Sequence, residues 1–314
     1  MQNKNLGRSI GSINSPDGFN LFFFNRPRFN QDNIYGFVRD NIYILKKNNE
    51  KSDNSCLYSL AGSYFSEKPS DLQYPFDFDD KGSLYIVSEV DSMPAWKKED
   101  KKNVFLGFTK YSMQIKVFNN QKCACVINLG SYEHSLINEM FVINRMLILL
   151  LTPKKWNESD KMFIEEQPPE LVFLDLDSTN LSFTSISLPD EPFSIDKSEE
   201  KLALLSSNGD ISIFSIKQRT IALENKWNNA NVKEKFPTYN KIMFRGSKNK
   251  LLLTNSHNDF LSVIPSDMNY EIRKIKNKKN ESIIKISADS KEKFVLLKQN
   301  TENLSLPEIY EFEF

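Results

Sequence analysis

The chain has 314 residues, with 41 Lys and Arg against 41 Asp and Glu, so a zero net charge gives no strong signal for nucleic-acid binding by the whole surface. Its longest apolar run, Met146–Leu151, is too short to span a bilayer and predicts a buried strand instead. Three cysteines (Cys56, Cys123 and Cys125) exclude a disulfide framework and favour a reducing intracellular compartment, cytoplasmic or nuclear, with the thiols as small apolar filler.

Short apolar runs with turn residues between them predict strands along the whole chain. They group into six units of up to four strands, whose inner strands start near 19, 73, 137, 193, 240 and 282. The first three units contain the strands 19–29, Asn33–Val38, Asn41–Leu45 and Cys56–Leu60, then 74–78, Ser83–Val90, Met113–Phe118 and Cys123–Leu129, then Ile137–Val142, Met146–Leu151, Leu171–Leu176 and Leu181–Leu188.

The last three units follow the same pattern, with Asn-Gly turns such as Asn208-Gly209. Their later strands are Lys201–Ser206, Asp210–Ile216, Thr220–Asn225, Lys250–Thr254, Asp259–Ile264, Tyr270–Ile275, Lys293–Leu297 and Glu308–Phe314. No segment keeps a helical period, apart from an expected short helical turn at Met93–Lys98.

Several strands are apolar at consecutive positions, as in Leu202–Leu205 and Leu251–Leu253. The strands of a sheet with one face in solvent would alternate apolar and polar residues, so these continuously apolar strands must be covered on both faces. Since crossover helices are missing, stacking between neighbouring sheets is the remaining solution, as in a β-propeller. We therefore predict one all-β domain over 1–314, a single β-propeller of four-stranded blades.

The sixth unit stops after its third strand, at Phe314, and 6–13 can supply the missing outer strand, which closes the ring and protects a sheet edge. Two polar insertions exceed the repeat, at 91–111 and 154–169, and predict loops or extra strands at a blade rim. The blade count is six, or seven if Val104–Thr109 forms a ladder strand of its own.

The units resemble divergent WD40-type propeller blades. Asp-Gly and Asn-Gly turns resemble the turns of such blades, and Leu176-Asp177, Ile216-Lys217 and Asn119-Asn120 stand where Trp-Asp is usual. No Gly-His dipeptide precedes a unit, so the Asp–His–Ser/Thr–Trp tetrad of the family cannot be assembled. The resemblance implies a non-enzymatic scaffold for protein–protein interaction, and we expect a subunit of a larger intracellular complex.

Two alternatives remain open. Phe244-Arg245-Gly246 resembles part of the Phe-Arg-Arg-Gly motif of phosphoinositide-binding propellers, with one Arg missing, and implies membrane binding. A propeller-fold enzyme is the weaker alternative, because His134 and His257 are the only histidines, both expected in solvent-facing turns, and no phosphate-binding glycine loop is present. The sequence indicates no catalytic residue, metal or cofactor.

Partner-binding candidates come from loop aromatics and one basic cluster. Aromatic residues in loops are enriched at protein interfaces, which favours the two insertions and the end of one outer strand. The cluster 273–279 could contact an acidic partner or phosphate, although it is a weak signal for nucleic acid. The candidates are Met93, Trp96, Trp156, Trp227, Arg273, Lys274, Lys276, Lys278 and Lys279, for binding other protein subunits or peptides.

Overall fold

The computed structural model of the chain describes residues 8–12, 25–30, 33–38, 41–47, 58–65, 75–99, 102–119, 122–165, 168–178, 182–188, 192–198, 200–217, 219–228, 239–245, 250–255, 259–264, 269–274, 281–288, 294–300 and 308–312. Most side chains between 75 and 228 are described, and beyond them those of Ile242, Phe244, Leu251 and Leu253. None of the helices in these ranges is long and apolar enough to cross a membrane.

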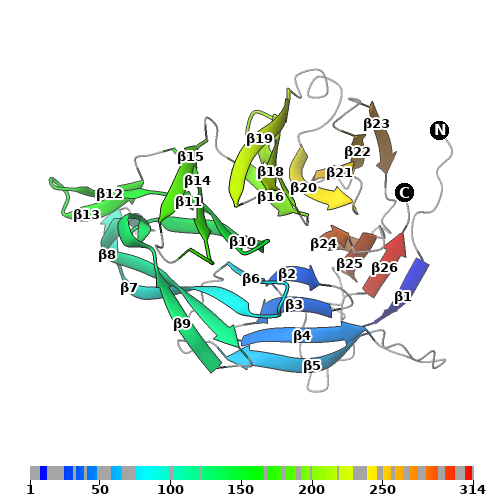
Figure 1. Cartoon of the computed structure of the whole chain (residues 1–314), viewed down its shortest axis with the longest axis horizontal. Helices are drawn as coiled ribbons and strands as arrows, with labels where there is room; N and C mark the ends of the chain where they lie inside the picture. The colour runs from blue at the N-terminus through cyan, green and yellow to red at the C-terminus, as the bar shows by residue number, and fades with distance from the viewer. Residues whose placement is uncertain are drawn as a thin grey trace.

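The described strands form six antiparallel sheets that follow one another around a common centre (Figure 1). The first sheet contains β2 (Asn25–Asn30), β3 (Asn33–Val38), β4 (Asn41–Lys47) and β5 (Tyr58–Phe65). The second contains β6 (Phe76–Phe78), β7 (Leu84–Glu99), β8 (Lys102–Asn119) and β9 (Lys122–Asn128), extended by β12 (Lys154–Asn157) and β13 (Met162–Glu165).

In each of the next two sheets, neighbouring strands follow one another in the same order as in the chain. The third contains β10 (Leu136–Ile143), β11 (Met146–Thr152), β14 (Glu170–Asp175) and β15 (Phe183–Ser187), and a short 3-10 turn at Gly130–Tyr132 precedes it. The fourth contains β16 (Pro192–Lys197), β17 (Lys201–Ser206), β18 (Ile211–Lys217) and β19 (Thr220–Trp227).

The last two sheets bring the chain back to its start. The fifth contains β20 (Tyr239–Arg245), β21 (Lys250–Asn255), β22 (Asp259–Ile264) and β23 (Asn269–Lys274), and the sixth contains β24 (Glu281–Ala288), β25 (Phe294–Asn300), β26 (Glu308–Phe312) and β1 (Arg8–Ser12). Strand β1 pairs with β26 in antiparallel register, from Arg8↔Glu311 to Ser12↔Glu308. The first and last described strands therefore lie side by side (Figure 1).

The predicted units correspond to these sheets. Five of the six inner strands start within three residues of the predicted positions, at 76, 136, 192, 239 and 281 against 73, 137, 193, 240 and 282. The first starts at Asn25 rather than near 19, and residues 13–24 lie outside the described ranges. The prediction of four-stranded antiparallel sheets is confirmed for five of the six sheets, and the second sheet has two further strands from the insertion at 154–165.

Neighbouring sheets bury both faces of the strands between them. In β11, Leu147, Leu149 and Leu151 pack in the cluster shared with the second sheet. The alternate residues Met146, Ile148 and Leu150 pack in the cluster shared with the fourth sheet. The continuous run Met146–Leu151 is therefore apolar because each of its faces meets another sheet.

The fourth sheet is buried in the same way. Ile211 and Ile213 of β18 pack against the fifth sheet, whereas Phe214 and Ile216 pack against the third. The two faces of β18 thus meet two different neighbouring sheets. Burying one such Leu, Ile or Phe stabilises the fold by about 1.5–3 kcal/mol relative to leaving it exposed, so these faces provide much of its stability.

Hydrogen bonds also join the inner strands of neighbouring sheets. Asp77 and Asp196 are each the second-last residue of their strands, β6 and β16. The carboxylate of Asp77 accepts a hydrogen bond from the backbone N–H of Val142 at 2.7 Å, and that of Asp196 accepts one from Phe244 at 2.8 Å. The sequence thus places the same side-chain bridge at the same position in two sheets.

Two expectations fail in the second sheet. Met93–Lys98 is part of strand β7 and forms no helical turn. Val104–Thr109, the segment of the alternative with an additional ladder strand, is part of β8. Cys123 and Cys125 are exposed on β9, so they are not apolar filler, and Cys56 lies outside the described ranges.

Candidate functional site

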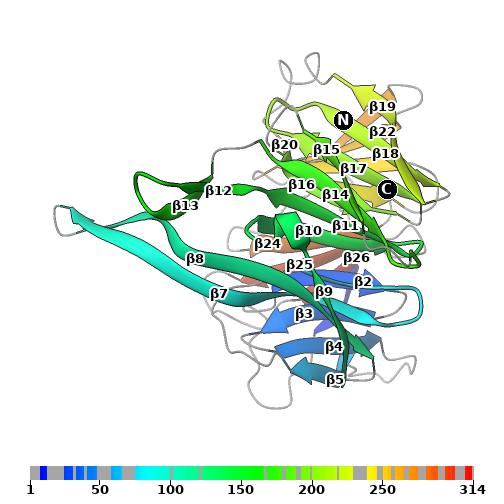
Figure 2. The ribbon, with the colours of Figure 1, turned by 60° about the vertical axis from the view of Figure 1, so that its left-hand side comes forward.

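The most unusual feature of the molecule is an arm that projects from the second sheet. We define the arm as residues 90–99 of β7, 102–111 of β8, and the hairpin 154–165, which contains β12 and β13. Figure 2 shows β7 and β8 extending well beyond the remaining sheets, with β12 and β13 beside them. The arm unites the two insertions, because β13 pairs with β8 at Phe163↔Phe108.

A glycine permits this contact between the two hairpins. Gly107 has a φ of +154°, which side chains rarely tolerate, and a Cβ built on it would lie 2.7 Å from the carbonyl oxygen of Phe163. That distance is shorter than any ordinary carbon–oxygen contact, so a larger residue would force β13 away from β8. Gly107 is therefore a position where close backbone approach requires glycine.

One face of the arm carries a row of aromatic side chains, which we call the aromatic row. Trp96 and Phe105 are opposite each other on β7 and β8, with ring centroids 5.2 Å apart. Phe105 contacts Phe108 at 5.1 Å, and Phe108 contacts Tyr111 at 4.6 Å. The exposed fraction falls along the row, from 58% at Trp96 through 45% at Phe105 to 5% at Tyr111. The row therefore starts in solvent and ends in the core.

The β12–β13 hairpin extends this aromatic surface. The ring of Phe163 packs against Trp156 at 5.0 Å and stacks on His134 at 4.5 Å. The Nδ1 of His134 donates a hydrogen bond to the Tyr111 carbonyl, which accepts it. His134 lies in a turn at the surface, with 40% of its side chain exposed, and its ring also helps to attach the arm to the sheets. His257 lies outside the described ranges.

The other face of the arm is also apolar. Val104 is 39% exposed, Leu106 41% and Met93 57%, although each lies in a strand. Six of the eight large apolar side chains that are exposed in the described part of the chain belong to the arm: Val90, Met93, Trp96, Val104, Phe105 and Leu106. Exposed apolar groups gathered in this way mark interaction surfaces, whereas single ones are ordinary.

The structure separates the candidates that the sequence groups together. Met93, Trp96 and Trp156 all lie on the arm. Trp227 is only 5% exposed and packs between the fourth and fifth sheets, a position in the core with little surface for a partner. Arg273 and Lys274 end β23, while Lys276, Lys278 and Lys279 lie outside the described ranges.

The phosphoinositide alternative falls on an inner strand. Phe244 is buried in the core, Arg245 ends β20, and Gly246 lies outside the described ranges. The Phe-Arg pair is thus the end of a core strand, and it matches the phosphoinositide-binding motif only in part.

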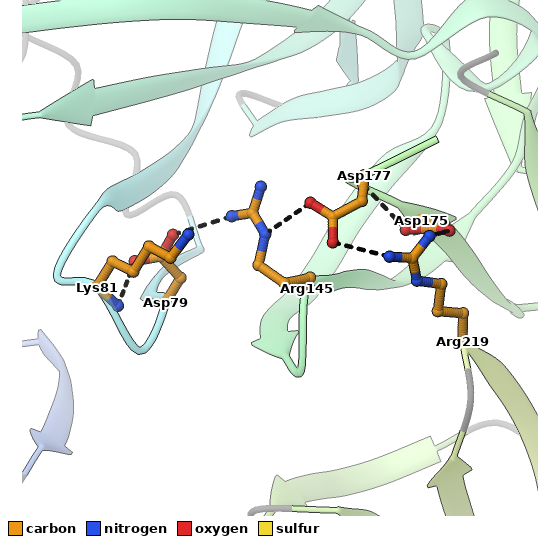
Figure 3. A network of polar contacts seen from close by, with 6 residues as sticks. All are labelled: Asp79, Lys81, Arg145, Asp175, Asp177 and Arg219. Atoms are coloured by element: carbon orange, nitrogen blue, oxygen red, sulfur yellow. Dashed lines mark hydrogen bonds and ion pairs between the residues drawn. The ribbon is translucent and has the colours of Figure 1, made fainter. Parts of the chain in front are cut away.

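Away from the arm, a cluster of charged side chains that the sequence did not indicate joins three sheets at their turns (Figure 3). Arg145 contacts Asp79 at 3.3 Å and Asp177 at 3.1 Å, and Arg219 contacts Asp175 and Asp177, both at 3.1 Å. Both arginines have a φ of 63°, in the left-handed region. Each cation already has carboxylate partners, so the cluster resembles a structural brace more than a ligand site.

Tyr85 lies beside this cluster. Burial raises the pKa of its hydroxyl, and the carboxylate of Asp79 raises it further, against the lowering effect of Arg145. The pKa of Arg145 is raised in spite of burial, which lowers it, because Asp177 accepts its hydrogen bond. These groups hold their protons over the physiological range and offer no base for catalysis.

No family model matches the sequence, and no curated protein matches it. The structure is similar to the WD40 domain of Pan2 from Neurospora crassa, with a TM-score of 0.52 and 10% identity over 92% of this chain and 75% of that domain. It is also similar to the β-propeller domain of Cps50 (Swd1) from Myceliophteria thermophila, with a TM-score of 0.48 and 10% identity over 97% and 99% of the two chains.

The similarity to the Pan2 domain shows that the fold is a divergent WD40-type β-propeller, as the sequence predicts. At 10% identity it shows the fold alone. The described sheets correspond to blades of this fold, and the arm is an addition to the second sheet.

Proposed function

We propose that this chain is a non-enzymatic interaction scaffold, a subunit of an intracellular complex, whose arm inserts into a groove of a partner protein. The observation that carries this proposal is the arm's exposed apolar surface, which lies on both faces of one hairpin. A two-stranded hairpin is marginally stable in water by itself. A partner that covers both faces would bury Trp96 and Phe105 as the anchors of the interface.

Two other observations support the scaffold reading. The fold is one whose blades present loops and edges around a rigid disc, which suits the holding of several partners. The chain has only three cysteines, and such low cysteine usage favours a reducing compartment. The imidazole of His134 has a structural role, because it donates a hydrogen bond to the Tyr111 carbonyl and stacks on the ring of Phe163.

The proposal is tested by comparing three tagged forms of the full chain in affinity purification from the source cells. The forms are wild type, the double variant Trp96→Ser/Phe105→Ser, and Leu223→Ser, which changes an apolar side chain of β19 that is 55% exposed and lies off the arm. Thermal denaturation first establishes that all three are folded.

The proposal expects proteins that co-purify with wild type and Leu223→Ser, and that fall at least tenfold with the arm variant. Because anchors at the centre of an interface each contribute about 2 kcal/mol or more, two losses should abolish stable capture. Equal recovery of the same partners by the wild type and the arm variant contradicts the proposal.

A further inference from the structure

The charges around the aromatic row limit what can cover it. At the tip, the described ends of β7 and β8 carry Lys97, Lys98 and Lys102 against the single carboxylate of Glu99. Lys98 lies two positions after Trp96 in the same strand, so alternation places it on the face of the aromatic row. Lys154 adds a second charge there, with its Nζ 5.3 Å from the centre of the Phe108 ring and 5.4 Å from that of Tyr111.

A second copy of the chain is a poor occupant. Two arms laid in parallel would bring the lysines of one tip next to those of the other, and two arms laid antiparallel would bring each tip next to Lys154 at the base of the other row. Like charges side by side are destabilising. The arm therefore favours an occupant of opposite charge.

A single-stranded nucleic acid satisfies the charge and could stack on Trp96 and Phe105. It would leave the other face uncovered, where Met93, Val104 and Leu106 are exposed. The flat bases of a nucleic acid stack on aromatic rings but pack poorly around branched aliphatic side chains, whereas a polypeptide combines carboxylates with apolar side chains of many shapes. Both faces together thus favour a protein segment.

We propose that the arm binds an acidic segment of a different protein, whose apolar side chains cover Trp96 and Phe105 while its carboxylates meet Lys98 on the same face and Lys102 on the opposite face of the tip. This inference rests on the proposed function, because it names the chemistry of the partner that the arm would engage. The apolar contacts supply affinity, and the charges select the partner and speed its association.

Selection of peptides on the full-length chain tests the inference. A displayed library of random 12-residue peptides is selected on the wild type, after removal of peptides that also bind Trp96→Ser/Phe105→Ser. The expected survivors are enriched in Asp and Glu together with apolar residues. Survivors enriched in Lys and Arg, survivors without a charge bias, or no arm-dependent survivors at all overturn the inference.

Synthetic fluorescein-labelled copies of the survivors then give affinities by fluorescence anisotropy. Lys98→Gln/Lys102→Gln should weaken binding about fivefold, as expected for two exposed ion pairs, and should reduce the salt dependence. The matched control Lys110→Gln/Lys161→Gln removes the same charge from lysines already paired with Asp91 and Glu158, and should change affinity by less than about twofold. Equal effects of the two double variants contradict the inference.

Labelled oligo-uridylate and oligo-thymidylate of 12 nucleotides test the competing occupant. Binding of either that is lost in Trp96→Ser/Phe105→Ser overturns the inference. If the arm variant loses its cellular partners while the selected peptides show no acidic bias, only the chemistry of the partner is wrong and the proposed function stands.

Discussion

The ammonium group of Lys197 donates a hydrogen bond to the carboxylate of Asp77, across 120 positions of the sequence. The same Nζ also donates to the carbonyl oxygen of Val142 at 3.0 Å, and the N–H of Val142 donates to Asp77. These three residues come from the inner strands of three successive blades, β6, β10 and β16. One ion pair thus fixes the relative positions of three blades near the centre of the ring.

Replacing Lys197 should destabilise the protein strongly. The Asp77 side chain is 4% exposed, so Lys197→Met leaves a buried carboxylate without its cation. The loss should be about 3 kcal/mol, the lower end for breaking a buried pair, because the Lys197 side chain is itself 26% exposed. Urea denaturation measures it. A Lys197→Met variant within about 0.5 kcal/mol of wild type would show that the pair contributes nothing.

Arg145 offers a comparison between side chain and backbone. Its φ of 63° disfavours any residue with a Cβ, by about 1 kcal/mol. Arg145→Ala and Arg145→Gly both lose the contacts with Asp79 and Asp177, but only the glycine relieves the backbone. We expect both variants to be less stable than wild type, with Arg145→Gly more stable than Arg145→Ala by about 1 kcal/mol. Equal denaturation midpoints for the two would argue against strain at this turn.

Tyr85 should make stability fall at alkaline pH. Its pKa is raised in the folded protein from the ordinary value of 10.0, chiefly by burial. The stabilising contribution is therefore complete below about pH 10 and is lost as the pH rises towards the folded-state pKa, since the unfolded chain ionises first. The free energy of unfolding should decline by up to about 1.4 kcal/mol per pH unit in that window.

Tyr85→Phe removes this one ionisation and leaves the other alkaline titrations in place. The difference in unfolding free energy between wild type and Tyr85→Phe should be constant below about pH 10 and should shrink above it. Denaturation curves at several alkaline pH values measure the difference. A difference that does not change with pH would mean that Tyr85 ionises equally in both states.

Gly107 should control the attachment of the β12–β13 hairpin to the arm. Gly107→Ala places a Cβ against the Phe163 carbonyl, so β13 must move away and Trp156 becomes more exposed. We expect faster proteolysis within 154–165 and a red-shifted tryptophan emission. Gly82→Ala is the matched control, since Gly82 also has a positive φ, of 81°, but has no atom near the added Cβ. Similar cleavage rates for both variants would contradict the role assigned to Gly107.

The repeat is readable from the sequence because each blade repeats the same local chemistry. Leu202–Leu205 is apolar at every position since both faces are buried, and Asn208-Gly209 supplies the turn before β18, with Gly209 at a φ of 87°. These signals are local, so a single sequence contains them.

The arm is not readable in the same way. The register of β7 and β8 shifts between Glu89 and Asp91, between Met93 and Pro94, and between Ala95 and Trp96. Each bulge interrupts the alternation of faces, so the segment loses the period of two that identifies a strand. The tryptophans signal an interface, but no local pattern indicates that Trp96 and Trp156 belong to one surface.

The remaining misses depend on contacts between distant residues. Trp227 looks like a loop aromatic because β19 is otherwise largely exposed, yet it lies opposite Ile211 and is covered by the fifth blade. The pairing of Arg219 with Asp177, 42 positions away, likewise becomes visible only when the third and fourth blades are packed together.

The hairpin of β7 and β8 lengthens two strands of a blade without interrupting them. Its outer part can therefore differ in length while the disc stays unchanged, provided that both strands gain or lose the same number of residues. An odd number would turn the row from Trp96 to Tyr111 onto the opposite face, whereas an even number keeps it in place. The distance of the aromatic row from the disc can thus vary in steps of two residues, or about 7 Å, with the same side always presented.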